Sequence, residues 1–326
     1  SRSGARPDPY HVLISESMLQ QTQVATVIPY YDRFIARFPT VQALAAADAQ
    51  DVLRLWQGLG YYSRAQNLLA AARMIVNDFA GQVPSDVESL LRLPGVGRYT
   101  AGAVASIAFD RRQPILDGNV ARVLCRLERI ESADVRDRET VARLWDLATE
   151  LVPKNRPGDF NQAVMDLGAT VCTPRNPQCL TCPLQNCCKA FAAGLQDRIP
   201  APRKTRITPL VKRQTLCIER AGKWLIEQRP PRGRWASMWQ FVTIAPRVAG
   251  ELARCSTKLG RINHTLTHRR YQFDVYRCRA NGTDIPASEA PRKWVSLTEL
   301  SEYPLPKPHL RIAKLLAAHK HESPKR

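Results

Sequence analysis

The chain has 326 residues, a net charge of +19 and a sequence pI of about 10.0, so it can form two domains and has nucleic acid as its expected partner. It contains no apolar run near the ~20 residues that a membrane-spanning helix needs, and its polar, proline-containing beginning is not a secretory signal. These features exclude a membrane protein and predict a cytoplasmic location, with association to the nucleoid if the source is bacterial.

The first half of the chain, from about Tyr10 to Ala192, has the spacing of short amphipathic helices separated by turn residues. One helix is predicted near residues 65–79. Another is predicted from six apolar residues that share one helical face: Val141, Leu144, Trp145, Ala148, Leu151 and Val152. This half is therefore expected to be mainly α-helical, with such faces forming its core.

The second half changes to the alternating pattern of β-strands. A proline-containing, charged segment at 194–210 is expected to be an extended linker. Residues 215–220 and 224–228 flank a short turn and predict a hairpin. Further strands are predicted at 270–279 and 293–297, and a closing helix at 310–319. The sequence thus predicts a helical domain over 1–193 and an α+β domain over 211–326.

Five of the nine cysteines gather in one segment. An odd, clustered set favours metal ligation in a reducing compartment over a disulfide framework. Cys172, Cys179, Cys182 and Cys188 follow the spacing C-x6-C-x2-C-x5-C. Four thiolates in one loop suit either a tetrahedral zinc ion or an iron–sulfur cluster, although the long first gap is less typical of zinc. Cys187 competes with its neighbour as the fourth ligand, and the spacing favours Cys188.

A glycine-containing hairpin, LPGVGRYTAG, lies at 93–102. Gly95 and Gly97 would let backbone N–H groups approach a phosphate closely, and the next helix would add the positive end of its dipole. Any corner between two helices has a similar pattern. Asp117 follows, directly after the apolar run Pro-Ile-Leu, where a carboxylate is unexpected. It is either a catalytic group or the N-cap of a helix.

Glu16 is a second candidate carboxylate, in the segment SESMLQQTQ. It stands among Leu13, Ile14, Met18 and Leu19. Apolar neighbours desolvate a carboxyl group, raise its pKa and favour a proton donor near neutral pH. The alternative is an exposed glutamate on a helix surface.

These motifs together resemble a known family. The hairpin followed by LDGN, and the cysteine spacing, resemble the helix-hairpin-helix DNA glycosylases that carry a [4Fe–4S] cluster; SESMLQQTQ resembles the catalytic segment of the MutY-type adenine DNA glycosylases among them. The resemblance implies a helix-hairpin-helix glycosylase fold with an iron–sulfur loop at 172–188, followed by a Nudix-like domain that detects 8-oxoguanine. It also implies a monomer that acts on double-stranded DNA with an A:8-oxoguanine or A:G mispair.

The resemblance assigns roles to the two carboxylates. Breaking an N-glycosidic bond through an oxocarbenium-like transition state needs a carboxylate beside the sugar and an acid at the departing base. The family pattern makes Glu16 the acid that protonates N7 of adenine. Asp117 would stabilise the sugar cation, directly or through a covalent intermediate, and Tyr99 and Asn119 would support the site. The same pattern assigns the cluster to Cys172, Cys179, Cys182 and Cys188.

The resemblance also bears on strand cleavage. Relatives that cut the strand attack the sugar with a lysine at the position of Tyr99. This chain has no lysine before Lys154. Because a Schiff-base mechanism needs an amine in the pocket, a monofunctional glycosylase is expected.

Substrate contacts are implied in both halves. In the first half, Gln21, Thr22, Leu59 and Tyr61 are expected near the lesion strand, and Gln162 at an edge of the adenine. In the second half, 233–241 (GRWASMWQF) resembles a tryptophan-containing strand of the recognition domain.

The sequence at 264–268 (HTLTH) resembles the family's lesion-reading loop. Thr267 and His268 keep a hydroxyl and an imidazole there, while Leu266 replaces an aromatic residue. The second half has no acidic Nudix box, so it is not expected to hydrolyse nucleotides.

Three other functions compete with this interpretation. They are a thymine or uracil mismatch glycosylase of the same superfamily, a DNA-binding or redox-sensing protein without enzymatic activity, and a bifunctional lyase. The segment around Glu16 and the second domain argue against the first, the intact pair of Glu16 and Asp117 against the second, and the absent lysine against the third.

Overall fold

A computed structural model describes residues 6–131, 137–201, 208–246, 256–280, 285 and 287–319. The chain forms two compact units: Ser1–Ala46 with Asn67–Thr205, and Ala47–Gln66 with Arg206–Arg326. The second unit therefore contains a segment from the helical half of the sequence, which the predicted boundary at 194–210 did not include.

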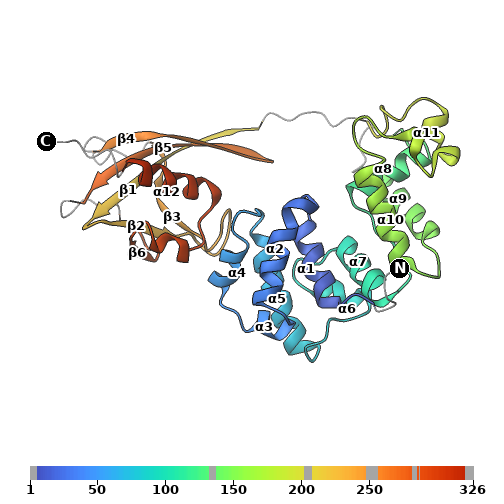
Figure 1. The fold of residues 1–326 in the computed structure, drawn as a ribbon, viewed down its shortest axis with the longest axis horizontal. Coiled ribbons are helices and arrows are strands. Elements are labelled where there is room, and N and C mark those ends of the chain that lie inside the picture. Colours follow the sequence, from blue (N-terminus) through green and yellow to red (C-terminus); the bar gives the residue numbers. More distant parts are fainter. Residues whose placement is uncertain are drawn as a thin grey trace. The chain divides into compact units, whose positions relative to one another are not determined.

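The first unit is all-α over its described residues (Figure 1). Its helices are α1 (Pro9–Leu19), α2 (Val24–Arg37), α3 (Val41–Ala45), most of α5 (Ser63–Asp78), α6 (Val87–Arg92), α7 (Arg98–Phe109), α8 (Gly118–Leu127), α9 (Arg138–Leu151), α10 (Pro157–Thr170) and α11 (Lys189–Ala192). The mainly helical first half and the helix predicted near 65–79 are confirmed. No helix among the described residues has the length and apolarity to cross a bilayer.

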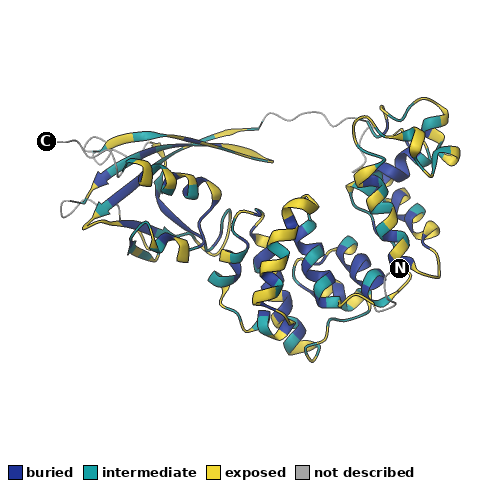
Figure 2. Ribbon diagram, in the orientation of Figure 1, coloured by how far each residue is buried: buried dark blue, intermediate teal, exposed yellow. Residues whose placement is uncertain are grey.

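Helix α9 tests the apolar face that the sequence predicted. Buried and exposed residues alternate along the helices of this unit (Figure 2). On α9, Leu144, Trp145 and Ala148 are buried, as is Val152 just beyond the helix. Leu151 was predicted on this face but is 43% exposed. The helix ends at Leu151, so Val152 leaves the helical spacing with an extended backbone and takes the buried position instead.

The predicted linker is shorter at its beginning than the sequence indicated. Ile199 is only 3% exposed, and its backbone carbonyl accepts a hydrogen bond from Arg126 Nε at 2.8 Å. Leu195 packs in the same apolar cluster of the first unit. The first residues of the predicted linker are therefore packed against the first unit, because burial of these two apolar side chains holds them there. Residues 202–207 lie outside the described part of the chain.

The second unit is built on a six-stranded sheet with the order β4-β5-β1-β3-β2-β6. Its elements are α4 (Ala49–Leu55), β1 (Leu210–Arg220), β2 (Lys223–Gln228), β3 (Trp239–Ile244), β4 (Thr257–Leu266), β5 (Arg269–Arg279), β6 (Arg292–Val295) and α12 (Lys307–His319). β1 and β5 pair in parallel, and the other pairs are antiparallel. The predicted hairpin is confirmed, with Glu219 opposite Trp224.

Two sequence interpretations in this unit need correction. Residues 233–241 were predicted as one strand, but β3 begins only at Trp239; Trp235 and Ser237 before it have positive φ angles that a strand cannot contain. Residues 264–268 were predicted as a loop, but β4 continues to Leu266. Only Thr267 and His268 form the turn that leads into β5.

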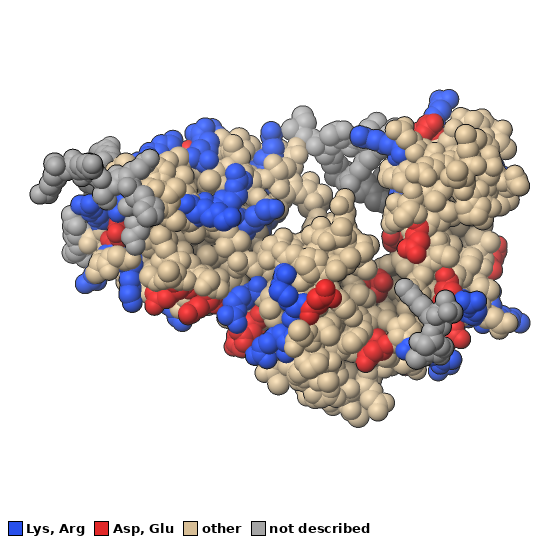
Figure 3. Space-filling view, in the orientation of Figure 1, with Lys and Arg blue, Asp and Glu red and all other residues tan. Residues whose placement is uncertain are grey.

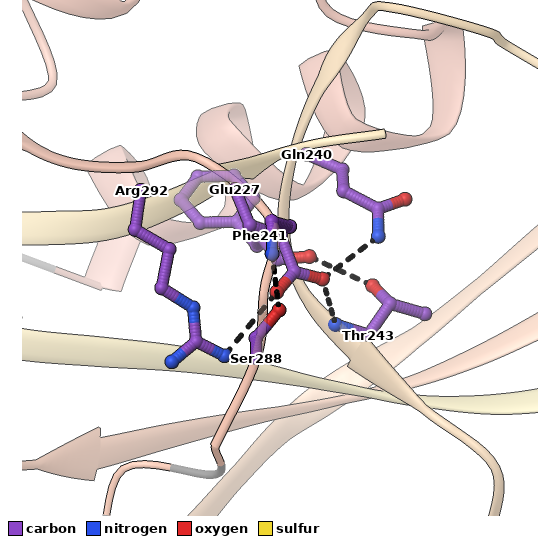
Figure 4. A network of polar contacts seen from close by, with 7 residues as sticks. Glu227, Gln240, Phe241, Thr243, Ser288 and Arg292 are labelled. Carbon is purple, nitrogen blue, oxygen red and sulfur yellow. Dashed lines mark hydrogen bonds and ion pairs between the residues drawn. The ribbon is translucent and has the colours of Figure 1, made fainter. Parts of the chain in front are cut away.

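A polar network joins β2, β3 and β6 (Figure 4). Glu227 Oε1 accepts hydrogen bonds from Gln240 Nε2 at 3.0 Å and from the backbone N–H of Thr243 at 3.4 Å. Glu227 Oε2 pairs with Arg292 Nη2 at 3.4 Å. One mostly buried carboxylate thus ties three strands together and is satisfied by protein partners.

His309 on α12 is fully buried against the sheet. Its Nδ1 accepts a hydrogen bond from the backbone N–H of Phe241 at 3.3 Å, and its ring lies near Phe273. Burial, together with the nearby Arg229 and His264, lowers the pKa of His309 to about 3. The imidazole is therefore neutral in the folded unit at ordinary pH.

Replacing His309 with Asn is expected to weaken the acid sensitivity of this unit. The pKa of His309 is about 3 in the folded unit, whereas the usual value for histidine is 6.5. The unfolded chain therefore binds more protons between these values, and stability falls as the pH drops through that window. The linkage amounts to about 2 kcal/mol between about pH 7.5 and about pH 5. Asparagine can still accept the Phe241 hydrogen bond but does not titrate. Urea unfolding at both pH values measures the difference; an equal acid loss in both proteins would contradict the prediction.

Candidate active site

Helix α1 brings Glu16 into the core of the first unit. The helix begins at the N-cap Asp8, whose side chain accepts the backbone N–H of Tyr10 at 2.7 Å. Glu16 is 6% exposed, and the Tyr99 hydroxyl on α7 donates to its Oε2 at 2.8 Å. Burial raises the pKa of Glu16, the Tyr99 hydrogen bond lowers it in part, and the charge of Asp117 raises it. The expected desolvation of Glu16 is confirmed, while its catalytic role stays a prediction.

A cavity of about 440 Å³ opens beside Glu16, within the size range of small-ligand sites. Gln162 and Met165 on α10 line it. The other lining residues are Pro7, Asp8, His11, Val12, Ser15, Leu19, Tyr31, Ile107 and Asp166. The sequence interpretation had not selected His11, Tyr31, Met165 or Asp166. Met165 and Asp166 had a detectable signal, because they follow Gln162 within about one helical turn.

Tyr99 connects the acid to this cavity wall. Its hydroxyl lies 2.8 Å from Glu16 Oε2 and 3.1 Å from Met165 Sδ. Burial and the neighbouring Glu16 carboxylate raise the pKa of Tyr99 above its usual value. Tyr99 is therefore a protonated donor that fixes the orientation of the Glu16 carboxyl group.

Asp117 is the N-cap of α8. Its Oδ1 accepts the backbone N–H of Val120 at 2.7 Å, so the structural interpretation of this residue is confirmed. The cap does not exclude a catalytic role, because a carboxylate has more acceptor positions than one hydrogen bond uses. Asp117 is half-buried, close enough to raise the pKa of Glu16, and outside the lining of the cavity.

Asn119 is held by an arginine that sequence reasoning missed. Arg122 Nη2 donates to Asn119 Oδ1 at 2.9 Å and to the Gly168 carbonyl at 2.7 Å, and its Nε donates to the Cys172 carbonyl at 2.8 Å. A Cβ at Gly168 would lie 2.8 Å from Asn119 Cβ, so glycine is required for α10 to approach α8. The available signal was the spacing of Arg122 and Arg126, which places both on one face of a helix.

The glycine hairpin connects α6 and α7. Gly95 has φ +79°, and a Cβ there would lie 2.7 Å from Asn67 Cβ, so both conformation and packing demand glycine. Gly97 is the N-cap of α7 and supplies no side-chain hydrogen bond. A Cβ on Gly97 would meet nothing within 4 Å. The space beside Gly97 is therefore open, and binding of a phosphate by the first N–H groups of α7 stays a prediction.

The cysteine loop follows α10 and includes the short helices Cys179–Thr181 and Gln185–Cys187. Cys172, Cys179, Cys182 and Cys188 line one small cavity of about 30 Å³ together with Arg126, whose Nη1 lies 3.3 Å from Cys172 Sγ. Cys187 is exposed, with its Sγ 3.3 Å from the Leu184 carbonyl, and does not line the cavity. This arrangement favours Cys188 over Cys187. The side chains of the described residues form no group of three or more that could hold a single metal ion.

The residues expected near the lesion strand belong to both units. Gln21, exposed with φ +56°, and the half-buried Thr22 lie in the first unit, at the turn between α1 and α2. In the second unit, Tyr61, Thr267 and His268 line a cavity of about 480 Å³. The hydroxyls of Tyr61 and Thr267 are 2.8 Å apart. Leu59 is 7% exposed and is not part of this lining.

Positive charge covers part of the second unit (Figure 3). Exposed cationic side chains on β1, β4 and β5 are Lys212, Arg220, Lys258, Arg261, Arg269, Arg270 and Arg279. Lys258 and Arg261 both pair with Asp274, while the chain as a whole keeps its net charge of +19. Such a surface attracts polyanions.

Two family models match the chain. One, described as HhH-GPD superfamily base excision DNA repair protein, matches residues 14–149, and the other, described as NUDIX domain, matches residues 214–315. The first spans Glu16, the glycine hairpin and Asp117. The predicted fold class, a helix-hairpin-helix glycosylase domain followed by a Nudix-like α+β domain, is confirmed.

Comparison with individual proteins narrows the family further. The structure resembles a thermostable thymine-DNA glycosylase, with a TM-score of 0.52 and 32% identity over 57% of this chain and 85% of that one. It also resembles endonuclease III in a trapped DNA covalent intermediate, with a TM-score of 0.51 and 26% identity over 59% and 88%. The adenine DNA glycosylase of Rattus norvegicus is 39% identical over 89% of this chain and 68% of its own length. The chain belongs to the adenine DNA glycosylase family.

Proposed function

We propose that this chain removes adenine mispaired with 8-oxoguanine or guanine from double-stranded DNA, by hydrolysis of the N-glycosidic bond. One observation carries the proposal: the buried Glu16 carboxyl, oriented by Tyr99, forms part of a cavity that Gln162 also lines. An enzyme that acts on a base within a duplex must turn that base out of the stack into such a cavity.

In the proposed reaction, the protonated Glu16 donates to N7 of the flipped adenine. The bond between the base and the sugar then breaks, its electron pair leaves with the base, and positive charge develops on the sugar. The negative charge of Asp117 stabilises that cation. Water supplies the hydroxyl that replaces adenine, and the remaining proton of that water passes to solvent, from which Glu16 is protonated again. Gln162 can pair through its side-chain amide with an edge of the base.

The expected product is an intact strand with an abasic site. Tyr99 stands where lyase-active relatives carry a lysine, and its hydroxyl is bonded to Glu16. No Schiff base can form without an amine at the sugar.

Labelled duplexes with A:8-oxoguanine, A:G, A:C, T:G and U:G pairs test the proposal. Each product is divided, and one half is treated with alkali. Release of adenine, fastest opposite 8-oxoguanine and visible as a strand break only after alkali, is the expected result. Breaks without alkali would contradict the monofunctional mechanism.

The same duplexes separate a second candidate function. The likeness to a thymine-DNA glycosylase structure favours testing mismatched thymine as a substrate. Faster release from T:G or U:G than from A:8-oxoguanine would assign the chain to mismatch repair of pyrimidines. Tight binding without release from any duplex would support a DNA-binding protein.

We further propose that Cys172, Cys179, Cys182 and Cys188 hold a [4Fe–4S] cluster. Four thiols on one cavity are the ligand set of such a cluster, and the Arg126 guanidinium near Cys172 Sγ offsets its negative charge. When bound, the cluster would cross-link the loop. It has no part in the proposed proton transfer.

Cys188→Ser is expected to lose iron, whereas Cys187→Ser keeps it. Only Cys188 of this adjacent pair lines the common cavity. Iron content and visible absorption of the purified variants, measured beside the unaltered protein, test the difference. Loss of iron in Cys187→Ser with retention in Cys188→Ser would reverse the ligand assignment.

A further inference from the structure

The loop before β3 holds Trp235 in a strained backbone conformation. Trp235 has φ +53° and Ser237 has φ +60°, a left-handed region that bulky residues rarely adopt. Strain of this kind persists only where the surroundings impose it, and it concentrates at ligand-binding sites.

Several hydrogen bonds impose the conformation. The backbone N–H of Ser237 donates to the Pro230 carbonyl at 3.0 Å. Two glutamines from the 47–66 segment form hydrogen bonds with the same turn. Gln66 Nε2 donates to the Ala236 carbonyl at 3.1 Å, and Gln50 Nε2 donates to the Ser237 carbonyl at 3.0 Å. The segment of the helical half that joins the second unit therefore fixes the loop that carries Trp235.

The indole ring has apolar support and remains half-buried. Its centroid lies 5.4 Å from the Tyr271 ring and 6.4 Å from the Phe273 ring, both in the core. Trp235 also lines the cavity of about 480 Å³ in the second unit. On that cavity it is joined by Tyr61 and by His264, whose ring centroid is 6.0 Å from the indole.

The cavity combines flat aromatic side chains with positive charge. Arg234 and Lys307 line it, and burial together with Lys307 lowers the pKa of His264, so this imidazole is neutral at ordinary pH. Aromatic faces stack nucleobases, and lysine and arginine neutralise phosphates. Leu266, which lines the same cavity, has no aromatic ring to stack on a base. Trp235 is therefore a principal aromatic surface of this cavity.

We infer that Trp235 is a stacking residue for the purine opposite the excised adenine. This inference rests on the proposed function, because it identifies the purine as the 8-oxoguanine or guanine of that mispair. The strained turn, held by Gln50 and Gln66, presents the indole to the cavity before DNA arrives, so little ordering of the loop is needed on binding.

Binding measurements with duplexes that resist cleavage test the inference. The first duplex carries a 2′-fluorinated adenosine opposite 8-oxoguanine, and the second carries the same analogue opposite an abasic site. Trp235→Leu is expected to weaken binding to the first by roughly 10-fold, as removal of a stacking aromatic does, and to leave the second unchanged. Trp235→Phe should restore most of the affinity, because it keeps an aromatic face.

Trp294→Leu is the matched control, since Trp294 packs in a different apolar cluster of the same unit. Unchanged affinity of Trp235→Leu for the 8-oxoguanine duplex, or an equal loss on both duplexes, would overturn the inference. Trp235-dependent binding of free 8-oxo-dGMP without any effect on the duplexes would also overturn it. Because the assay requires no catalysis, a protein that fails to excise adenine refutes the proposed function without deciding this result.

Discussion

Replacing Asp117 with Asn is expected to reduce adenine excision by on the order of 10²- to 10³-fold or more while leaving the fold intact. Asparagine is as good an N-cap as aspartate, so its Oδ1 keeps the hydrogen bond that Val120 donates at 2.7 Å. It removes only the negative charge, and a charge placed where the transition state develops its own is worth several kcal/mol. Single-turnover excision from an A:8-oxoguanine duplex measures the loss.

Asp86→Asn is a matched control for this variant. Asp86 is also an N-cap, on α6, where its Oδ1 accepts the backbone N–H of Ser89 at 2.8 Å. If both variants melt like the unaltered protein and only Asp117→Asn loses activity, the charge itself is required. Full excision activity of Asp117→Asn would leave Asp117 with only the structural role of an N-cap.

Glu16→Gln is expected to slow excision by about 10²- to 10⁴-fold, the usual contribution of a general acid. Glutamine can still bond to Tyr99 and fits the same buried position, but it cannot deliver an acidic proton to adenine. The exposed Glu88 in the same unit offers a control as Glu88→Gln. A Glu16→Gln protein with normal single-turnover rates would remove Glu16 from the chemistry.

The pH dependence of excision should follow the protonation of Glu16. Burial raises the pKa of Glu16, so the rate is expected to fall as the pH rises through a midpoint above the usual value of 4.5. The Tyr99 hydrogen bond stabilises the carboxylate and lowers that pKa. Tyr99→Phe should therefore move the midpoint of the pH–rate profile to higher pH, and a shift to lower pH would contradict the assigned hydrogen bond.

Local chemistry made several features of this protein readable from its sequence. Leu13, Ile14 and Met18 are close to Glu16 in sequence and are all buried, so this apolar run already predicts that α1 lies in the core. The cysteine spacing brings four thiols to one loop, and the alternation around 221–223 forms the predicted hairpin. Each of these depends on residues within a few turns or strand positions of one another.

Other features depended on which distant surfaces meet. No periodicity in 47–66 indicates that Gln50 and Gln66 bond to a loop 170 or more residues later in the chain. The hydrogen bonds of Arg122 were equally hidden in the sequence, because the packing of α10 on α8 brings its partners Gly168 and Cys172 to it. The sequence by itself determined the helical and sheet halves, the apolar neighbours of the acid and the thiol loop, since short-range patterns and spacing govern them. Only the tertiary structure decided that residues 47–66 join the second unit, that Arg122 bonds to Asn119, and that Trp235 adopts a strained backbone. Long-range packing selects these arrangements among many that are locally equivalent.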